Sequence, residues 1–207
     1  LLDTSESLAF KDYGAMSKIE YASHLAAGLM FMLISQGDTV GLMTFDSALR
    51  RQYEPVGSME GLRHLLLALE EIKAAGRSNI EAAIHEAAQQ IHSRSLVIII
   101  SDLLQQPAEV VRGLRHLHHD KHAIMVVHVM DSAEIRLSYA GMAEFRELET
   151  GARMVVEIDD VRQAYAQEVQ RYIEEIRTGC GSCLAAHHLI DTRSPLEESL
   201  FMRLAKA

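Results

Sequence analysis

The chain has 207 residues, 48% of them hydrophobic, which is enough for one domain with a substantial core. Its 29 acidic and 20 basic residues give a formal net charge of −9, and no long basic stretch occurs, so nucleic acid and anionic membrane surfaces are not expected partners. No apolar run approaches the roughly 20 residues that span a bilayer, so we expect no membrane insertion by this segment.

The chain opens with Leu1-Leu2 followed by Asp3-Thr4-Ser5-Glu6-Ser7. An Asp-x-Ser-x-Ser run behind a buried strand brings together one carboxylate and two hydroxyls, the hard oxygen ligands that suit a divalent cation. The same residue types also form turns and helix caps, so the pattern alone is weak. Strands normally have about 5–6 residues and only two precede Asp3, so we expect the first strand to begin upstream of this sequence.

An alternation of helices and strands follows. Ser17, with Glu20 three residues later, has the capping-box spacing and predicts a helix that ends near Ser35. The next expected elements are a strand at 39–45, a charged edge strand at 49–53 in a hairpin with it, and helices at 58–73 and 79–92. They are followed by a strand at 96–100, a helix at 107–118, a strand at 123–129 and a polar hairpin-like region at 135–158. The last expected elements are a helix capped by Asp159 or Asp160 and ending near 177, a strand at 184–190 and a helix at 195–206. This order predicts an α/β fold: a central, mostly parallel sheet with one antiparallel edge strand and helices on both faces.

Two later loops also offer oxygen ligands. The run Leu96-Val97-Ile98-Ile99-Ile100 is apolar throughout, as in a strand covered on both faces, and Asp102 follows it. Ser78 lies just before another expected helix. Ligands of open α/β sheets bind outside the carboxyl ends of the strands. We therefore predict one site for Mg²⁺, or for Mn²⁺ or Ca²⁺, formed by five residues: Asp3, Ser5, Ser7, Ser78 and Asp102. The alternative for each residue is a turn or helix cap.

This set resembles the metal-ion-dependent adhesion site of von Willebrand factor A domains, where an Asp-x-Ser-x-Ser loop, a Thr and a later Asp surround one cation. The chain is also similar to the DUF58 family through motifs that include Lys18-Ile19-Glu20-Tyr21-Ala22, Ile100-Ser101-Asp102-Leu103 and Phe145-Arg146-Glu147-Leu148-Glu149-Thr150-Gly151. The resemblance implies a Rossmann-like three-layer sandwich and a single domain over 1–207 that lacks its upstream region. The chain departs from the family pattern at two positions: the usual Thr is Ser78, which keeps the hydroxyl, and the usual Asp after it is Asn79, which removes charge beside the site.

The resemblance implies a non-catalytic module that binds protein through the metal. Mg²⁺ prefers octahedral oxygen ligands and keeps exchangeable positions, so a protein partner can supply an Asp or Glu side chain to it. The family likeness further implies an adaptor that works with a MoxR-type AAA+ ATPase in the assembly or remodelling of complexes. The alternative is a metal-dependent phosphohydrolase on a doubly wound α/β fold, but these enzymes need a second Asp at the position of Ser5. We expect no enzymatic activity.

The remaining motifs favour structural roles. Cys180 and Cys183 have the spacing of redox and zinc motifs, but no second pair exists and the motif follows a helix, so we interpret them as structural or incidental thiols. The histidines at 116, 118, 119 and 122 fit a solvated helix end. His187 and His188 are consecutive in a strand and point to opposite faces, so they cannot chelate one ion together. Two reduced cysteines favour a cytoplasmic location, with an upstream membrane anchor left open.

Overall fold

The computed structural model describes residues 1–12, 15–146 and 151–204, with only the backbone described for 201–204. Its main sheet has six strands in the order β3-β2-β1-β4-β5-β8. β3 is antiparallel to β2, and the other neighbours are parallel. The expected fold class is therefore confirmed. The strands are β1 (Leu2–Asp3), β2 (Val40–Phe45), β3 (Leu49–Val56), β4 (Leu96–Ser101), β5 (Ala123–Met130) and β8 (Ala186–Asp191).

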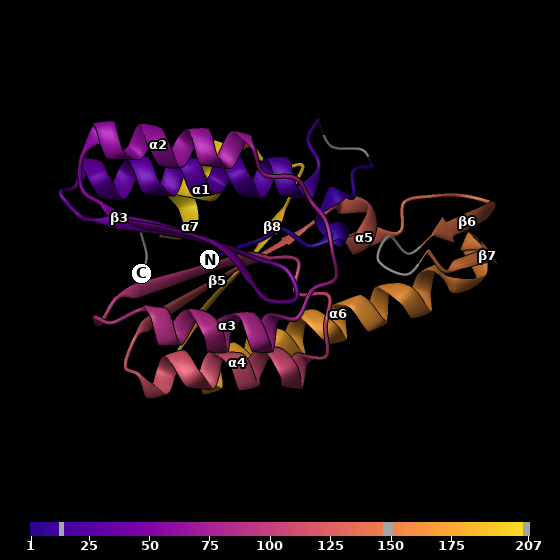
Figure 1. Ribbon diagram of the computed structural model, residues 1–207. Coiled ribbons are helices and arrows are strands. Elements are labelled where there is room, and N and C mark those ends of the chain that lie inside the picture. Colours follow the sequence, from indigo (N-terminus) through magenta and orange to yellow (C-terminus); the bar gives the residue numbers. More distant parts are fainter. Residues whose placement is uncertain (13–14, 147–150, 205–207) are drawn as a thin grey trace.

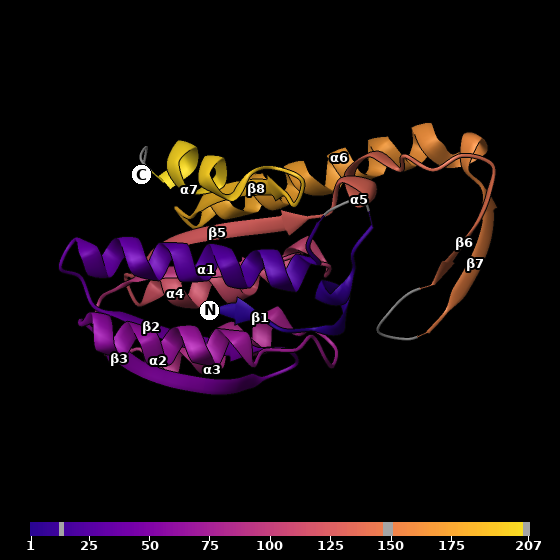
Figure 2. The same ribbon diagram turned by 90° about the horizontal axis from the view of Figure 1, so that it is seen from above.

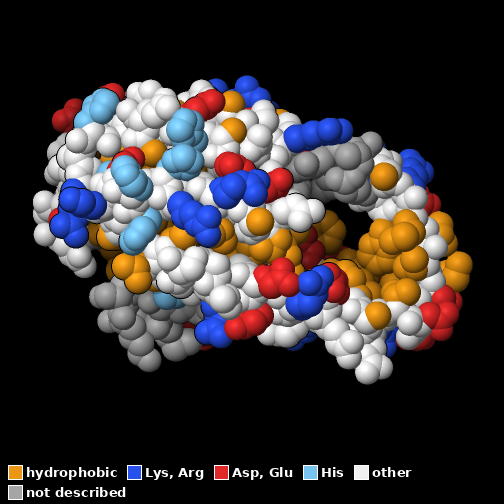
Figure 3. Space-filling view, turned by 90° about the horizontal axis from the view of Figure 1, so that it is seen from below, with side chains coloured by type: hydrophobic (Ala, Val, Ile, Leu, Met, Phe, Trp, Pro, Cys, Tyr) orange, Lys and Arg blue, Asp and Glu red, His pale blue; other side chains and the backbone are white. Residues whose placement is uncertain are grey.

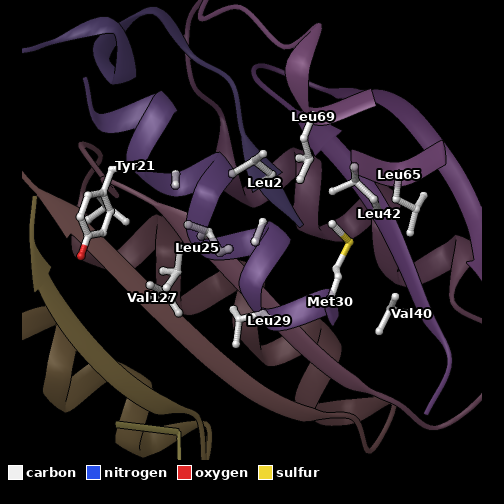
Figure 4. Packing of buried hydrophobic residues seen from close by; sticks show 14 of the residues in the cluster. Leu2, Tyr21, Leu25, Leu29, Met30, Val40, Leu42, Leu65, Leu69 and Val127 are labelled. Carbon is white, nitrogen blue, oxygen red and sulfur yellow. The ribbon is translucent and has the colours of Figure 1, made fainter. Parts of the chain in front are cut away.

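Helices cover both faces of this sheet (Figure 1). One face carries α1 (Lys18–Ser35), α2 (Met59–Glu70) and α7 (Leu196–Leu204), and the other carries α3 (Ile80–Gln90), α4 (Pro107–His119) and α6 (Ile158–Ser182). On the first face, Leu25 and Leu29 of α1 pack in one buried cluster with Leu42 and Val127 of the sheet (Figure 4). A second buried cluster lies under α3, α4 and α6. Since both faces are covered, the central strands consist almost entirely of apolar residues.

The order of the strands reverses at β1. The chain passes from β1 to β2 on one side and later returns to β4 on the other side, so Leu2 is paired with both Thr44 and Ile100. Such a switch point opens a crevice at the carboxyl ends of the strands, where ligands of α/β proteins bind. Asp3, at the end of β1, and Asp102, just after β4, both lie at this crevice.

The capping box at the start of α1 is confirmed. The backbone nitrogen of Ser17 donates to Glu20 Oε2 at 2.7 Å, and the backbone nitrogen of Glu20 donates to Ser17 Oγ at 3.4 Å. These reciprocal bonds satisfy two amide groups that the first turn leaves free, so the helix begins at Lys18. Lys18 is fully buried.

Two details of the carboxyl-terminal half differ from the expectation. α6 begins at Ile158 and runs to Ser182, and its N-cap is Glu157. The expectation that Asp159 or Asp160 caps this helix is wrong, because the chain enters α6 directly from a strand and both acids already lie in the first helical turn. A short helix, α5 (Ser132–Arg136), was not predicted, because one turn is too short for a periodic pattern.

The predicted hairpin in the region 135–158 is present. It consists of β6 (Met142–Arg146) and β7 (Arg153–Glu157), an antiparallel pair separate from the main sheet. Figures 1 and 2 show that this pair, called the arm below, projects from the end of the molecule to which the carboxyl ends of the parallel strands point. Among the described residues, no helix is long and apolar enough to cross a membrane.

Candidate functional site

The Asp3 loop forms the centre of the candidate site. Asp3 and Ser5 are fully buried, and Ser7 is nearly so. The backbone nitrogen of Ser5 donates to Asp3 Oδ1 at 2.9 Å, and the hydroxyls of Ser5 and Ser7 share a hydrogen bond of 3.2 Å. The Asp-x-Ser-x-Ser run therefore turns back on itself directly after β1. Its three side chains form a compact set of oxygen atoms.

β4 contributes a residue that the sequence prediction missed. Ser101 is the last residue of the strand, and its hydroxyl donates to Asp3 Oδ2 at 2.5 Å. The same oxygen of Ser101 accepts a hydrogen bond from the backbone nitrogen of Leu103 at 3.0 Å. Ser101 therefore links β1 to the loop that carries Asp102. The available signal was a hydroxyl residue at the end of an otherwise apolar strand.

The Ser78 loop brings a fourth predicted residue to Asp3. Ser78 Oγ donates to Asp3 Oδ2 at 3.4 Å, a long hydrogen bond. The backbone holds this loop against the Asp3 loop, since Glu6 N donates to Gly76 O and Ala75 N donates to Thr4 O, both at 2.8 Å. These bonds bring hydroxyls from distant parts of the chain to one carboxylate.

Gln105, another residue that was not predicted, binds the backbone of the Ser78 loop and of the start of α3. Its Nε2 donates to Ser78 O at 2.6 Å, and its Oε1 accepts from Ile80 N at 2.7 Å. One side chain from the loop after β4 thus satisfies two backbone groups around the start of α3. A Gln in a polar loop has no pattern that identifies such a role.

Asn79 and Gly76 have structural roles beside the site. Asn79 is the N-cap of α3, and its side-chain oxygen accepts from Ala82 N at 3.1 Å, so the departure from the family pattern keeps a helix cap. Gly76 has a φ of +80°, and a Cβ atom there would lie 2.9 Å from Asp46 Oδ2. Only glycine combines that backbone conformation with so little space.

Asp102 is placed differently from the other four residues. Its Oδ2 lies 2.8 Å from the ammonium of Lys18, which also lies 2.6 Å from Glu134 Oε1. Burial alone would lower the pKa of Lys18, but the charges of Asp102 and Glu134 outweigh it and raise that pKa. Asp102 is thus already half of a buried ion pair. The sequence prediction placed Asp102 at the correct end of the sheet and did not include its partners.

The electrostatics of Asp3 favour a bound cation. Its pKa is raised to about 7, first by burial and then by the charge of Asp102, and the hydrogen bonds from Ser101 and Ser5 only partly oppose this. A carboxylate that is costly to ionise in isolation is stabilised by a nearby positive charge. A cation at the Asp3 loop would supply that charge.

The donor set fits a hard cation such as Mg²⁺. The 3.2 Å between the hydroxyls of Ser5 and Ser7 is close to the roughly 3.0 Å that separates neighbouring ligands in an octahedron with bonds of about 2.1 Å. Within the described part of the chain, no three His, Cys, Asp or Glu side chains are grouped so as to hold a metal. Hydroxyl oxygens such as those of Ser5 and Ser7 suit Mg²⁺ better than zinc.

The other motifs lie elsewhere. Cys180 and Cys183 are free and buried, and burial, followed by the neighbouring thiol, raises the pKa of Cys180 to about 12. His116 packs edge to face on His85, with 4.7 Å between the ring centroids. His187 lies beside His128 of β5, at 3.3 Å between Nε2 and Nδ1. That pairing was not predicted.

A cavity of about 650 Å³ lies away from the candidate site. It is lined by the amino-terminal parts of β2 and β4 and by α1, with Leu29, Val40 and Ile98 among its residues. Asp3 and Asp102 lie at the opposite, carboxyl ends of their strands and do not line it. The cavity is therefore not part of the cation site.

Comparisons with known proteins support the family and the fold. A family model described as "Protein of unknown function DUF58" matches residues 1–175. The structure is similar to that of the conserved hypothetical protein BatB from Bacteroides thetaiotaomicron, with a TM-score of 0.61 and 16% identity over 99% of this chain and 95% of that one. It is also similar to an aerotolerance-related membrane protein from Bacteroides fragilis, with a TM-score of 0.61 and 19% identity over 100% and 96% of the two chains. No curated protein matches the sequence. At these identities the likeness concerns the fold alone.

Proposed function

Since the chain belongs to the DUF58 family, whose description assigns no activity, we propose a function from the site itself: a non-catalytic module that binds a protein partner through Mg²⁺. The main support for the proposal is the arrangement of the Asp3 loop. A buried carboxylate with a raised pKa lies beside two hydroxyls at octahedral spacing. The resemblance to the adhesion site of von Willebrand factor A domains leads to the same ligand set.

Four residues of the site have distinct parts in this proposal. Ser5 and Ser7 coordinate through their hydroxyls, and Asp3 supplies the negative charge. Asp102 does not bind the cation directly but lies behind its ligands, since one of its oxygens is already paired with Lys18. When bound, the cation supplies a positive charge with an exchangeable position, and the partner's Asp or Glu side chain completes its coordination.

Binding is favoured over hydrolysis by the residue types at the site. A phosphohydrolase of the doubly wound kind needs an acid two residues after the first Asp to move a proton, and Ser5 occupies that position. A serine hydroxyl is too weak an acid to replace a carboxylic acid in that role. The site thus has ligands for a cation and lacks the acid that this alternative requires.

The wider context of the proposal comes from the family resemblance. A MoxR-type AAA+ ATPase would be the partner enzyme, with this domain as the adaptor that presents client proteins to it. The proposal places the domain in the cytoplasm, where such an ATPase finds its nucleotide.

Metal titration tests the proposal directly. Millimolar Mg²⁺ or Mn²⁺ should raise the melting temperature of the wild type and give measurable heat in calorimetry, because a ligand of the native state stabilises it. The double variant Ser5→Ala/Ser7→Ala should lose both effects, and Ser93→Ala, an exposed serine outside the site, should keep them. Asp102 is a poor choice for this test, because its removal also leaves Lys18 buried with one partner fewer. A folded wild type with neither heat nor thermal shift refutes the proposal.

A further inference from the structure

The arm has one apolar face and one charged face. In an antiparallel pair, residues opposite each other share a face, and faces alternate along each strand. Phe145 lies opposite Met154, and Ala143 lies opposite Val156, which makes one face wholly apolar. The other face carries mostly charged side chains, with Arg153 and Glu144 in an ion pair of 3.1 Å. The residues of that second face are Met142, Glu144, Arg146, Arg153, Val155 and Glu157.

The apolar face is only partly covered. Ala143, Phe145 and Val156 are half-buried, whereas Met154 is 61% exposed. Figure 3 shows hydrophobic side chains on the side of the arm that borders an opening between the arm and the body. An isolated two-stranded hairpin is marginally stable in water, so such a face gains stability when another apolar surface covers it.

The root of the arm is linked through α6 and α5 to Lys18, the partner of Asp102. Arg162 Nη2 donates to Tyr139 O at 2.6 Å, and Ile158 N donates to Gly141 O at 3.0 Å, which fixes the arm to the start of α6. Tyr165 of α6 donates to Glu134 O at 2.7 Å. The side chain of Glu134 in turn binds Lys18, the partner of Asp102. A chain of short polar contacts therefore connects the arm to the carboxyl end of the sheet.

We propose that the arm and the candidate cation site bind one partner together, an extended protein segment that combines an acidic side chain with bulky apolar ones. The inference rests on the proposed function, because the cation is what receives the acidic side chain. The apolar side chains of the segment pack on Phe145 and Met154, and Leu104, which is exposed two residues after Asp102, adds apolar surface at the site. The arm is a sheet of two strands, so within the described residues β6 and β7 each have one strand neighbour, and an extended segment could add a third strand.

Charge favours this occupant over a second copy of the chain. The net charge of −9 opposes self-association, whereas a single acidic side chain is attracted to a cation at the Asp3 loop. The acid gives the segment its dependence on metal. The apolar residues beside the acid determine which segment binds.

Two neighbouring residues provide a matched pair of variants. Met154 and Val155 are adjacent, apolar and similarly exposed, at 61% and 58%, but they lie on opposite faces of the arm. Met154→Ser removes the most exposed side chain of the apolar face, and Val155→Ser makes a comparable change on the charged face. Neither residue contacts the candidate site, so both variants should bind Mg²⁺ like the wild type. Circular dichroism checks that each variant folds.

The probe is a displayed library of short linear peptides with one central Asp and randomised flanking positions, selected on the full chain in Mg²⁺. We expect the selected peptides to carry aromatic or aliphatic residues beside the Asp. Met154→Ser should weaken their binding about tenfold or more, the loss expected when a buried Met side chain is removed, and Val155→Ser should leave it unchanged. Chelator and Ser5→Ala/Ser7→Ala should abolish binding.

Each other outcome overturns the inference in a distinguishable way. If Met154→Ser and Val155→Ser bind the peptides equally well and in a metal-dependent way, the arm is not part of the interface. The proposed function would still stand. Binding that needs Met154 but ignores chelator refutes the proposed function together with the inference. A dimer in sedimentation that Met154→Ser dissociates and Val155→Ser does not would show that a second copy covers the face. Failure to select any peptide that depends on both metal and Met154 also overturns it.

Discussion

The ammonium of Lys18 lies 2.8 Å from Asp102 Oδ2, and both side chains are completely buried although 84 residues separate them in the chain. The ammonium is a fixed positive charge beneath the candidate cation site. It offsets the negative charge that Asp102 adds near Asp3. A cation at the Asp3 loop therefore meets Asp3 and the hydroxyls first, with Asp102 already paired.

Removal of Lys18 should destabilise the metal-free fold. Lys18→Met leaves the buried Asp102 and the partly buried Glu134 without their shared partner. Loss of one member of a buried ion pair typically costs about 3–5 kcal/mol in the free energy of unfolding. Chemical denaturation in chelator measures this. The control is Lys18→Met combined with Asp102→Asn and Glu134→Gln, which removes the unpaired charges and should recover most of the loss. A loss below about 1 kcal/mol for the single variant would contradict the prediction.

Metal affinity should rise with pH. The pKa of Asp3 is raised to about 7, and a cation binds only the ionised carboxylate, so protons compete with the metal at and below that pH. Between pH 8 and pH 6 the association constant for Mg²⁺ should fall about tenfold, by the fraction of Asp3 that becomes protonated. Calorimetric titration at the two pH values measures it, with release of protons on binding near pH 7 as an independent readout. A constant affinity would show that Asp3 does not titrate with metal binding.

Gln105→Leu should loosen the Ser78 loop. The substitution removes the donor to Ser78 O and the acceptor for Ile80 N, so we expect a loss of about 1–3 kcal/mol in the free energy of unfolding and a weaker metal site. Gln106→Leu is the matched control, because Gln106 is the adjacent, exposed residue and its side chain does not cap α4. Equal stability and equal metal affinity in the two variants would exclude Gln105 as a positioning residue for the site.

The two cysteines should be unreactive in the native protein. Both thiols are buried, and the pKa of Cys180 is raised to about 12 by burial and by Cys183, so almost no thiolate of Cys180 is present at neutral pH. Iodoacetamide should modify neither residue in buffer and both in denaturant, as read by mass spectrometry. Replacement of both by Ala should leave Mg²⁺ binding unchanged. Rapid native labelling, or stoichiometric zinc that the substitutions remove, would indicate a functional motif.

His128 should make the fold sensitive to acid. Burial and the neighbouring His187 lower its pKa from 6.5 to about 3, so it stays neutral in the native state while the unfolded chain takes up a proton below pH 6.5. This contribution to stability is present above pH 6.5 and is lost as the pH falls. From pH 7 to pH 5 the wild type should lose about 2 kcal/mol relative to His128→Phe. Comparison with the variant cancels the titration of groups that do not contact His128, and parallel pH profiles of the two proteins would refute the assignment.

Local sequence patterns determined the elements around the site. The capping box at Ser17 and Glu20 acts across three residues, and Asn79 caps the helix that begins at the next position, so neither needs the rest of the fold. The apolar run before Ser101 is sufficient to identify a strand covered on both faces. The parallel order of the strands then places Asp3, Ser78 and Asp102 at one end of the sheet. The expectations of a bound metal, a protein partner and no catalysis stay predictions.

Only the tertiary structure decided what each of these residues contacts. Three contacts join residues that are 27 to 84 positions apart in the chain. Lys18 pairs with Asp102, Gln105 binds the backbone of the Ser78 loop, and His128 contacts His187. A single sequence has no periodicity or spacing that links such positions, because the contacts depend on how whole helices and strands pack. The same reason applies to the arm: alternation along β6 and β7 identifies one apolar face, but only the folded chain shows that the body leaves Met154 exposed at the end of the sheet that carries Asp3.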